Sequence, residues 1–214
     1  HTAYWYRNIG SELRLIALDT VNRFGGWQGC LHREQFEWLS HLLDESKDKY
    51  VVLTSHHPLE NLFNGYAPEE ERSPALEEEL RRLLEKHPNV ILWFSGHVHD
   101  HKITQSRNSD GSHAFWEIRT GSHIDWPQQS RTIEIVKSNN GKIAIGTVVF
   151  DHAGPVVFSG TPDELADPVA LAGLSRLLAA NDWQRQQDGP FNIELLAGEP
   201  EDRNIWLWAN DPLM

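Results

Sequence analysis

The stretch that most constrains the fold is residues 89–101, which reads Asn-Val-Ile-Leu-Trp-Phe-Ser-Gly-His-Val-His-Asp-His. Residues 90–95 are almost all apolar, β-branched or aromatic, which is typical of a strand buried on both faces. Beyond the glycine that ends this run, His97, His99 and His101 occupy alternate positions. If the chain stays extended, the three side chains project to one side. If it turns at the glycine, they line the loop at the carboxyl end of the strand, where open α/β sheets bind their ligands.

Strands and helices alternate upstream of this stretch. Residues 13–19 and 50–54 have the apolar pattern of core strands, and apolar residues at helical spacing begin after His32. A second helix is expected to begin with Ser73 as its N-cap and Pro74 at its first position. The order strand, helix, strand, helix, strand predicts parallel pairing with right-handed crossovers.

Beyond His101 the pattern changes to hairpins. Residues 102–107 and 113–119 flank Asn-Ser-Asp-Gly. Residues 131–137 and 142–150 flank Ser-Asn-Asn-Gly, whose Asn-Gly pair favours a tight type I′ turn. We therefore expect antiparallel pairing in this half of the chain.

The C-terminal part is predicted to be helical before it becomes irregular. Thr161-Pro162-Asp163-Glu164 is a capping box that opens one short helix, and Asp167-Pro168 begins another that runs to about Ala180. The remaining residues mix proline, glycine and tryptophan with little period, and we expect them to wrap around the surface. We accordingly interpret residues 161–214 as a helical segment and C-terminal wrap of the same domain as residues 1–160.

Composition limits the kinds of partner. The chain has 214 residues with 19 basic and 31 acidic side chains, and its formal net charge of −12 argues against a nucleic acid or an anionic membrane as the main partner. No run approaches the roughly 18 apolar residues that a membrane-spanning helix needs. The single cysteine, Cys30, excludes an intramolecular disulfide and a Cys-rich zinc site. Because the chain begins at His1 and its only methionine is Met214, we interpret it as a fragment.

Histidines follow two of the predicted parallel strands. His56 lies just beyond the strand at 50–54, and His97 and His99 lie just beyond the strand at 90–95. Because the carboxyl ends of parallel strands meet at one edge of a sheet, we expect these three side chains to converge. A lone His-x-His pair is often only polar surface, so the convergence is the specific part of the signal. Imidazole is the commonest protein ligand for transition metals, and the pattern therefore favours a metal site.

The same residues resemble the motifs of a known family. Gly96-His97-Val98-His99 after a buried strand, with His56-His57-Pro58 after the preceding strand, resembles the last two motifs of the calcineurin-like metallophosphoesterases. Further segments are similar to those that the family places between its early and late motifs, namely Leu18-Asp19-Thr20, Gly29-x-Leu31 and Gln35-x-x-Trp38-Leu39. The resemblance extends over about residues 4–150.

A later segment resembles one bacterial branch of that family, which has long inserts and commonly a twin-arginine export signal. This segment is Arg119-Thr120-Gly121-Ser122-His123-Ile124-Asp125-Trp126-Pro127-Gln128-Gln129. The resemblance makes export by that route an alternative, and the compartment is otherwise unknown. It also implies the fold. Residues 1–160 are expected to be the C-terminal part of an α/β metallophosphoesterase domain, a sandwich of mixed parallel and antiparallel sheets flanked by helices.

The resemblance also implies a site and a reaction. His56 and His97 would bind one metal and His99 another. The complete protein would hold two divalent or trivalent ions, Mn, Fe or Zn, and this fragment none or one. Hydroxide activated by the metals would hydrolyse a small phosphate mono- or diester. His57 and His101 are the expected substrate contacts, and no catalytic residue is assigned.

The chain departs from the family in its early motifs. Asp-x-His, Gly-Asp-x-x-Asp and Gly-Asn-His supply that family's bridging carboxylate, most of its remaining metal ligands and a histidine thought to protonate the leaving group, and none of the three occurs in these 214 residues. A hard two-metal site needs that carboxylate. We therefore expect the chain alone to be inactive. The rest of the site would lie in a removed N-terminal half, a disordered part or a second polypeptide.

Several of these side chains also have a simpler interpretation. His57 would cap a helix and face solvent, the interpretation that we prefer, and His101 would be the first exposed residue of the next strand. For His123 and Asp125, in a glycine-anchored loop, we prefer a turn with local hydrogen bonds. The tryptophans that we expect in the core or against the sheets, rather than in a ligand-stacking platform, are Trp93, Trp116, Trp126 and Trp183.

Two other classes of function remain open. In one, His56, His97 and His99 hold a single zinc ion with an open position, as in a simpler hydrolase. In the other, the chain is a non-catalytic structural or partner-binding module. A broad apolar edge left uncovered would indicate a truncated enzyme, whereas a well-covered surface would favour the independent module.

Overall fold

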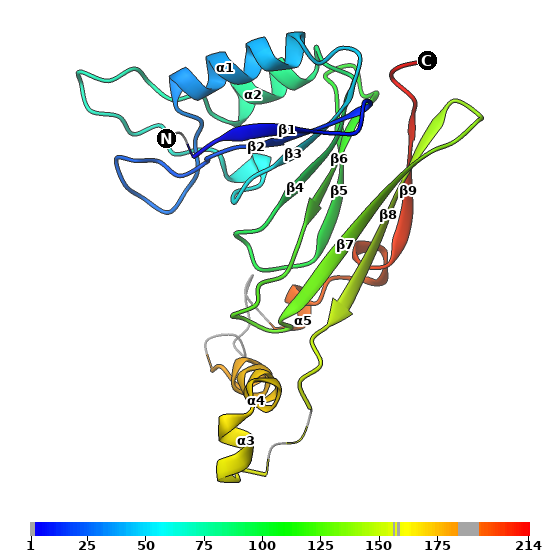
Figure 1. Ribbon diagram of the computed structural model, residues 1–214. Coiled ribbons are helices and arrows are strands. Elements are labelled where there is room, and N and C mark those ends of the chain that lie inside the picture. The colour runs from blue at the N-terminus through cyan, green and yellow to red at the C-terminus, as the bar shows by residue number, and fades with distance from the viewer. Residues whose placement is uncertain (1–2, 156, 158, 184–192) are drawn as a thin grey trace.

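Two β-sheets and a pair of helices form the layers of the body. The computed structural model describes residues 3–155, 157, 159–183 and 193–214. Figure 1 shows helices α1 and α2 over one face of a six-stranded sheet, with a three-stranded sheet on its other face. One apolar core lies between the helices and the large sheet, and a second lies between the two sheets. The helices are α1 (Arg33–Asp44), α2 (Glu77–Leu84), α3 (Pro162–Ala166), α4 (Pro168–Ala180) and α5 (Ile193–Leu196), with short 3-10 turns η1 (Leu59–Asn61) and η2 (Pro200–Asp202).

The larger sheet has the strand order β1-β2-β3-β4-β6-β5. Strands β2, β3 and β4 run parallel, with α1 and α2 as the connections between them, so the predicted alternation is confirmed. Both β3 and β4 are buried along almost their whole length. Because they pair in parallel, their carboxyl ends lie at the same edge. The strands of this sheet are β1 (Trp5–Ile9), β2 (Leu13–Ala17), β3 (Tyr50–Thr54), β4 (Val90–Ser95), β5 (Lys102–Arg107) and β6 (His113–Arg119).

Helix α2 begins later than the sequence suggests. The predicted start at Ser73 and Pro74 is wrong, because the helix begins at Glu77 without a side-chain cap. The cause is a bridge between Leu31 and Ala75, which exchange backbone hydrogen bonds of 2.9 and 2.8 Å and keep this stretch extended. A contact with a distant loop thus overrides a good local start signal.

The first hairpin pairs in a way that the sequence did not reveal. Strands β5 and β6 are antiparallel as predicted, but β6 also pairs in parallel with β4. Strand β6 carries the buried Phe115 and Ile118, whereas β5 is rich in polar residues. The apolar strand therefore takes the inner position and the polar strand takes the edge, so the expectation of purely antiparallel pairing beyond residue 101 is wrong.

The second sheet contains a strand where a surface wrap was expected. Its strands are antiparallel, and the hairpin of β7 and β8 is confirmed. In β9, Leu207 and Ala209 are buried while Trp206 and Trp208 are half exposed, an alternation of period two hidden by its unusual composition. The strands are β7 (Gln129–Lys137), β8 (Lys142–Asp151) and β9 (Ile205–Asn210).

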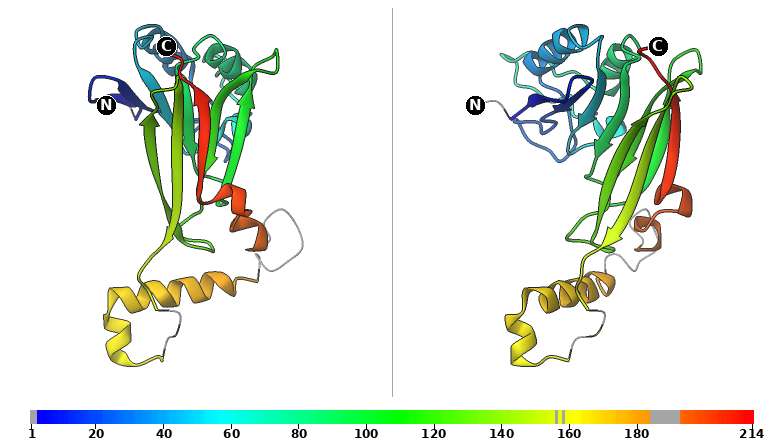
Figure 2. Two further views of the ribbon diagram at one scale, coloured as in Figure 1. Left: turned by 90° about the vertical axis from the view of Figure 1, so that its right-hand side faces the viewer. Right: turned by 45° about the vertical axis from the view of Figure 1, so that its right-hand side comes forward.

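Helices α3 and α4 project from the end of the second sheet, away from both cores (Figures 1 and 2). The predicted capping box is present, since Thr161 Oγ1 accepts the Glu164 N–H at 3.4 Å. Asp167 Oδ1 caps α4 by accepting the Val169 N–H at 3.1 Å. No helix among the described residues is both long and apolar enough to cross a bilayer.

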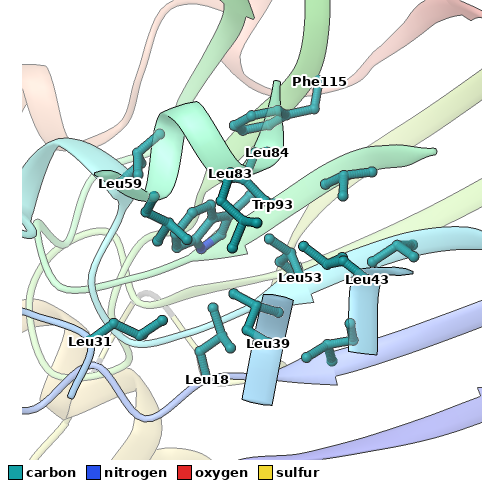
Figure 3. Close-up of a cluster of buried hydrophobic side chains, with 14 of the residues drawn as sticks. Leu18, Leu31, Leu39, Leu43, Leu53, Leu59, Leu83, Leu84, Trp93 and Phe115 are labelled. Carbon is teal, nitrogen blue, oxygen red and sulfur yellow. The ribbon is translucent and has the colours of Figure 1, made fainter. Parts of the chain in front are cut away.

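The tryptophans divide between core and surface. Trp93 is fully buried among leucines of α2, β3 and η1 (Figure 3). Trp116 is partly buried against the core between the sheets, as predicted. Trp126 is also partly buried. Trp183, by contrast, is 65% exposed, so the core interpretation is wrong for that residue, which follows the projecting helix α4.

The space between the two sheets is open along one edge. Among the described strands β7 pairs only with β8, so its other side is a free sheet edge. Beside it lies a groove of about 250 Å³ with an almost wholly apolar lining. The sandwich therefore leaves core-type side chains accessible along this edge, and those that line the groove are Ile9, Leu13, Leu15, Val52, Thr54, Leu92, Phe94, Ile133 and Ile135.

Candidate metal centre

The ends of β3 and β4 bring two imidazoles together. The loops that follow these strands are joined by backbone hydrogen bonds from Ser55 N–H to the Phe94 carbonyl (3.1 Å) and from Gly96 N–H to the His56 carbonyl (3.0 Å). As a result, His97 Nδ1 and His56 Nε2 lie 3.1 Å apart. The predicted convergence of these two histidines is present in the structure.

The distance between these nitrogens fits a shared metal ligand set. For zinc–nitrogen bonds of about 2.0–2.1 Å, tetrahedral and octahedral angles place neighbouring ligand atoms about 2.9–3.4 Å apart. The 3.1 Å between His56 and His97 falls in that interval. The same distance also suits a hydrogen bond between the two rings, so the contact accommodates a metal without requiring one.

The loop after β4 turns rather than staying extended. His97 and His99 have φ angles of 69° and 66°, and Val98 N–H donates to the Gly96 carbonyl at 2.8 Å. A left-handed backbone is unfavourable for residues with a Cβ atom, and such strain is concentrated at functional sites. This turn separates the alternate histidines, because His97 and His99 stay on the loop while His101 enters the interior.

The surroundings keep the paired imidazoles neutral. Burial, with smaller contributions from the neighbouring histidines, lowers the pKa of His97 to about 4. Burial and the same kind of neighbours also lower the pKa of His56. A neutral imidazole retains the lone pair that a metal needs, so both side chains are suited to metal binding at neutral pH.

His57 lies beside this pair but is fully engaged by the protein. One nitrogen each of His56, His57 and His97 lies within 4.8 Å of the others. His57 is only 3% exposed, its Nε2 lies 2.9 Å from the Trp27 carbonyl, and its Nδ1 lies 2.8 Å from Thr20 Oγ1. Because a carbonyl only accepts, Nε2 carries the hydrogen and Nδ1 accepts from the hydroxyl. The solvent-facing helix cap is therefore wrong, and the predicted substrate contact stays a prediction.

His99 has a partner that the sequence did not identify. Its Nδ1 lies 2.5 Å from Asp125 Oδ2. The loop is indeed a turn with local hydrogen bonds, as expected, because Ser122 Oγ accepts the Ile124 N–H at 2.9 Å. The side chain of Asp125, however, points across to the histidine loop. His123 does not join the site, since its Nε2 contacts Ser130 Oγ at 2.9 Å.

His101 is buried away from the other histidines. Its ring is 0% exposed, and Nδ1 accepts from Gly121 N–H at 3.2 Å and from Arg131 Nη2 at 3.1 Å. Burial and the positive charge of Arg131 lower its pKa to about 4. The simpler interpretation, in which His101 is the first exposed residue of the next strand, is wrong. The predicted substrate contact of His101 stays a prediction, and it would require this packing to open.

Two partly buried contacts hold the histidine loops on the sheet. Trp93 Nε1 donates to Ser55 Oγ at 2.8 Å, and that hydroxyl donates to the His57 carbonyl at 2.6 Å. Arg119 on β6 donates to both carboxylate oxygens of Asp100, at 2.9 and 2.7 Å. A bidentate pair of this kind fixes geometry as well as charge. Neither contact leaves a signal in the sequence, since each joins segments far apart in the chain.

The comparisons with known proteins concern the part of the chain that holds these histidines. The calcineurin-like phosphoesterase family matches residues 4–101. Because of this similarity we refer to residues 4–101 as the calcineurin-like phosphoesterase segment. A dimetal phosphatase from Danio rerio aligns with 66% of this chain and 56% of its own, at 16% identity and a TM-score of 0.44. The chain thus spans little more than half the length of that structure, and no curated protein matches it.

The calcineurin-like phosphoesterase segment contains all the histidines predicted for the site. It ends at His101, so Asp125 and the support from Arg119 lie beyond it. The candidate centre therefore draws on the segment and on the β6–β7 region that follows it. The roles of the individual histidines as ligands stay predictions.

A buried carboxyl on β6 makes the stability of this region depend on pH. Glu117 is 8% exposed and its Oε1 accepts the Leu59 N–H at 2.8 Å. Burial raises its pKa from 4.5 to about 6. The folded state therefore holds an extra proton between these values, so ionisation of Glu117 costs stability as pH rises from 4.5 through 6. A shift of this size corresponds to about 2 kcal/mol.

We expect Glu117→Gln to be more stable than the wild type at pH 7.5, by up to about 2 kcal/mol, since the amide still accepts from Leu59 and never ionises. At pH 4.5 the difference should vanish. Urea unfolding followed by circular dichroism at the two pH values measures it. Glu134→Gln, on an exposed position of β7, is the matched control. Equal stability of wild type and Glu117→Gln at pH 7.5 would contradict the raised pKa of Glu117 in the folded protein.

Proposed function

We propose that this chain supplies the histidine part of the active site of a metal-dependent phosphoesterase. The observation that carries the proposal is the 3.1 Å approach of His97 Nδ1 to His56 Nε2 at adjoining strand ends. It is supported by the family match over residues 4–101. Because the chain has a net charge of −12, attraction for a phosphate ester would come from bound metal rather than from the protein's overall charge.

In this proposal His56 and His97 hold one ion and His99 holds the second. The neutral state of the first two at physiological pH keeps their lone pairs available. When bound, two divalent or trivalent ions would supply hydroxide near neutral pH and neutralise charge on the phosphoryl oxygens of a mono- or diester. The protein's own contribution is to fix the ligands through the strained turn after β4 and the hydrogen bonds that join the two loops.

We also propose that the metal site is incomplete in this chain. The group of closely spaced ligand atoms among the described residues consists of histidines, without a carboxylate. The open, apolar edge beside β7 supports the absence of a covering segment. We propose that an N-terminal half of the same protein covers it and brings the carboxylates, with a small phosphate ester as substrate.

The two alternatives receive less support. A mononuclear zinc site needs three free imidazole nitrogens, but His57 uses both of its nitrogens in hydrogen bonds. His99, the third ligand originally expected, lies outside the close group of His56, His57 and His97. A non-catalytic module would be expected to cover its own core, and the groove beside β7 is uncovered.

The test is hydrolysis of p-nitrophenyl phosphate with and without manganese, for this chain and for the protein extended at its N-terminus. We expect manganese-dependent turnover in the extended protein and none in this chain. Turnover by the chain alone would refute the incomplete site. An extended protein that binds no metal and stays inactive would refute the phosphoesterase. His56→Ala and His97→Ala in the extended protein should each abolish turnover.

A further inference from the structure

The shortest contact that a candidate metal ligand makes with another segment joins His99 to Asp125. Oδ2 of Asp125 lies 2.5 Å from His99 Nδ1, and the two side chains are 16% and 33% exposed. They come from different loops, one after β4 and the other between β6 and β7. The contact therefore depends on the fold rather than on neighbouring sequence.

The Asp125 carboxylate is held from its own side as well. Asp125 N–H donates to Ser122 Oγ at 3.5 Å, and the Asp125 carbonyl accepts the Gln128 N–H at 3.0 Å. The Gln128 amide donates in turn to the Ile124 carbonyl at 3.0 Å and to Ser175 Oγ of α4 at 2.9 Å. This loop is thus anchored on both sides of the carboxylate, which gives the side chain a fixed direction.

The chemistry of the contact decides which nitrogen of His99 is free. An ionised carboxylate only accepts hydrogen bonds, so Nδ1 of the imidazole must carry the hydrogen. In the neutral ring Nε2 then keeps its lone pair. Metal-binding histidines generally donate their other N–H to a carboxylate or carbonyl, which sets the tautomer and the ring orientation. The backbone alone does not supply that orientation, since His99 lies in a left-handed turn with φ of 66°.

We propose that Asp125 is a positioning residue that holds His99 in its Nδ1–H tautomer and directs Nε2 to a metal ion. The inference rests on the proposed function, in which His99 is a metal ligand. It extends the site beyond the calcineurin-like phosphoesterase segment, which ends at residue 101. In this role Asp125 acts through the imidazole of His99 and is not itself a ligand of the ion.

A purely structural ion pair would hold the loop without setting the tautomer, so the test must read the ring itself. In a chain with ¹⁵N-labelled histidine, two-dimensional NMR distinguishes a protonated from an unprotonated ring nitrogen. At pH 7.5 and without metal, we expect wild-type His99 to show protonated Nδ1 and unprotonated Nε2. Asp125→Ala should shift the ring to a mixture of tautomers. Asp125→Asn should shift the ring towards the opposite tautomer, with the hydrogen on Nε2, because its amide N–H₂ can donate to Nδ1, which an ionised carboxylate never does.

The second readout is zinc affinity of the N-terminally extended protein, in which the proposal places the second ion, measured by competition with a chromophoric chelator. We expect Asp125→Ala to lower the affinity for the zinc ion bound through His99 by roughly 10–100-fold, the usual effect of losing such a partner. Asp125→Asn should weaken it by a comparable factor, because a hydrogen on Nε2 blocks the nitrogen that would bind the ion. Asp163→Ala, an exposed carboxylate in α3, is the control and should change neither readout. Thermal melting of each variant identifies any that fails to fold, and Asp125→Asn then carries the test.

The outcomes separate this inference from the proposed function. If Asp125→Ala leaves both the tautomer and the zinc affinity unchanged, or if wild-type His99 carries its hydrogen on Nε2, the positioning role is overturned. If the wild-type extended protein binds no zinc, the proposed function fails, while the tautomer measurement on this chain still decides whether Asp125 fixes the ring.

Discussion

Replacing His97 by alanine is expected to weaken zinc binding by the chain at least about a hundredfold, more than the loss of an outer partner causes. The imidazole of His97 lies 3.1 Å from that of His56, and both are neutral at physiological pH, so each offers a lone pair to one shared ion. Chelator competition at pH 7.5 measures the change. Unaltered affinity in His97→Ala would remove the basis for a metal site at these strand ends.

The matched control is His41→Ala, which removes an exposed imidazole from α1. It should leave zinc affinity unchanged. The double variant of His56 and His97 gives a sharper reading, because two ligands of one ion lose their effect together. We expect the zinc affinity of the double variant to be close to that of either single variant. Fully additive losses would place the two histidines at separate ions.

The largest loss of stability is expected from Trp93→Ala. This side chain is fully buried in the core beneath α2, and truncating a buried tryptophan costs about 3–5 kcal/mol through lost burial and the cavity left behind. The change also removes the hydrogen bond to Ser55 Oγ, which supports the loop carrying His56. Urea unfolding monitored by circular dichroism measures the free energy of unfolding.

Two companion variants separate packing from the hydrogen bond. Trp93→Phe keeps most of the apolar volume and loses the N–H donor, so it should cost less than Trp93→Ala. Any additional loss of zinc affinity in Trp93→Phe would report on the support of the histidine loop. Trp183→Ala removes a tryptophan that is 65% exposed and should be nearly neutral. A cost below about 1 kcal/mol for Trp93→Ala would contradict its place in the core.

Local patterns predicted the parallel strands and the meeting of His56 with His97, because burial on both faces and strand order suffice to place strand ends at one edge. They did not predict features set by distant contacts. The start of α2 depends on a bridge between Leu31 and Ala75, and the inner place of β6 depends on competition between two strands.

The candidate site shows the same division. The spacing of the histidines was sufficient to identify candidate ligands, but not to say which nitrogen is free. Both ring nitrogens of His57 are occupied by hydrogen bonds with Thr20 and Trp27, which lie about 30 or more positions earlier in the chain. Asp125 reaches His99 through the direction of one side chain in a turn, and a pattern of residue types carries no information about that direction.

The left-handed backbone at His97 and His99 places thermostability and metal binding in opposition. Glycine adopts such φ angles without penalty, and asparagine does so more readily than most residues, whereas other side chains lose roughly 1–2 kcal/mol. A chain optimised only for folding would replace both imidazoles. Selection of this protein for heat resistance alone would therefore tend to remove the candidate metal-binding imidazoles at these two positions first.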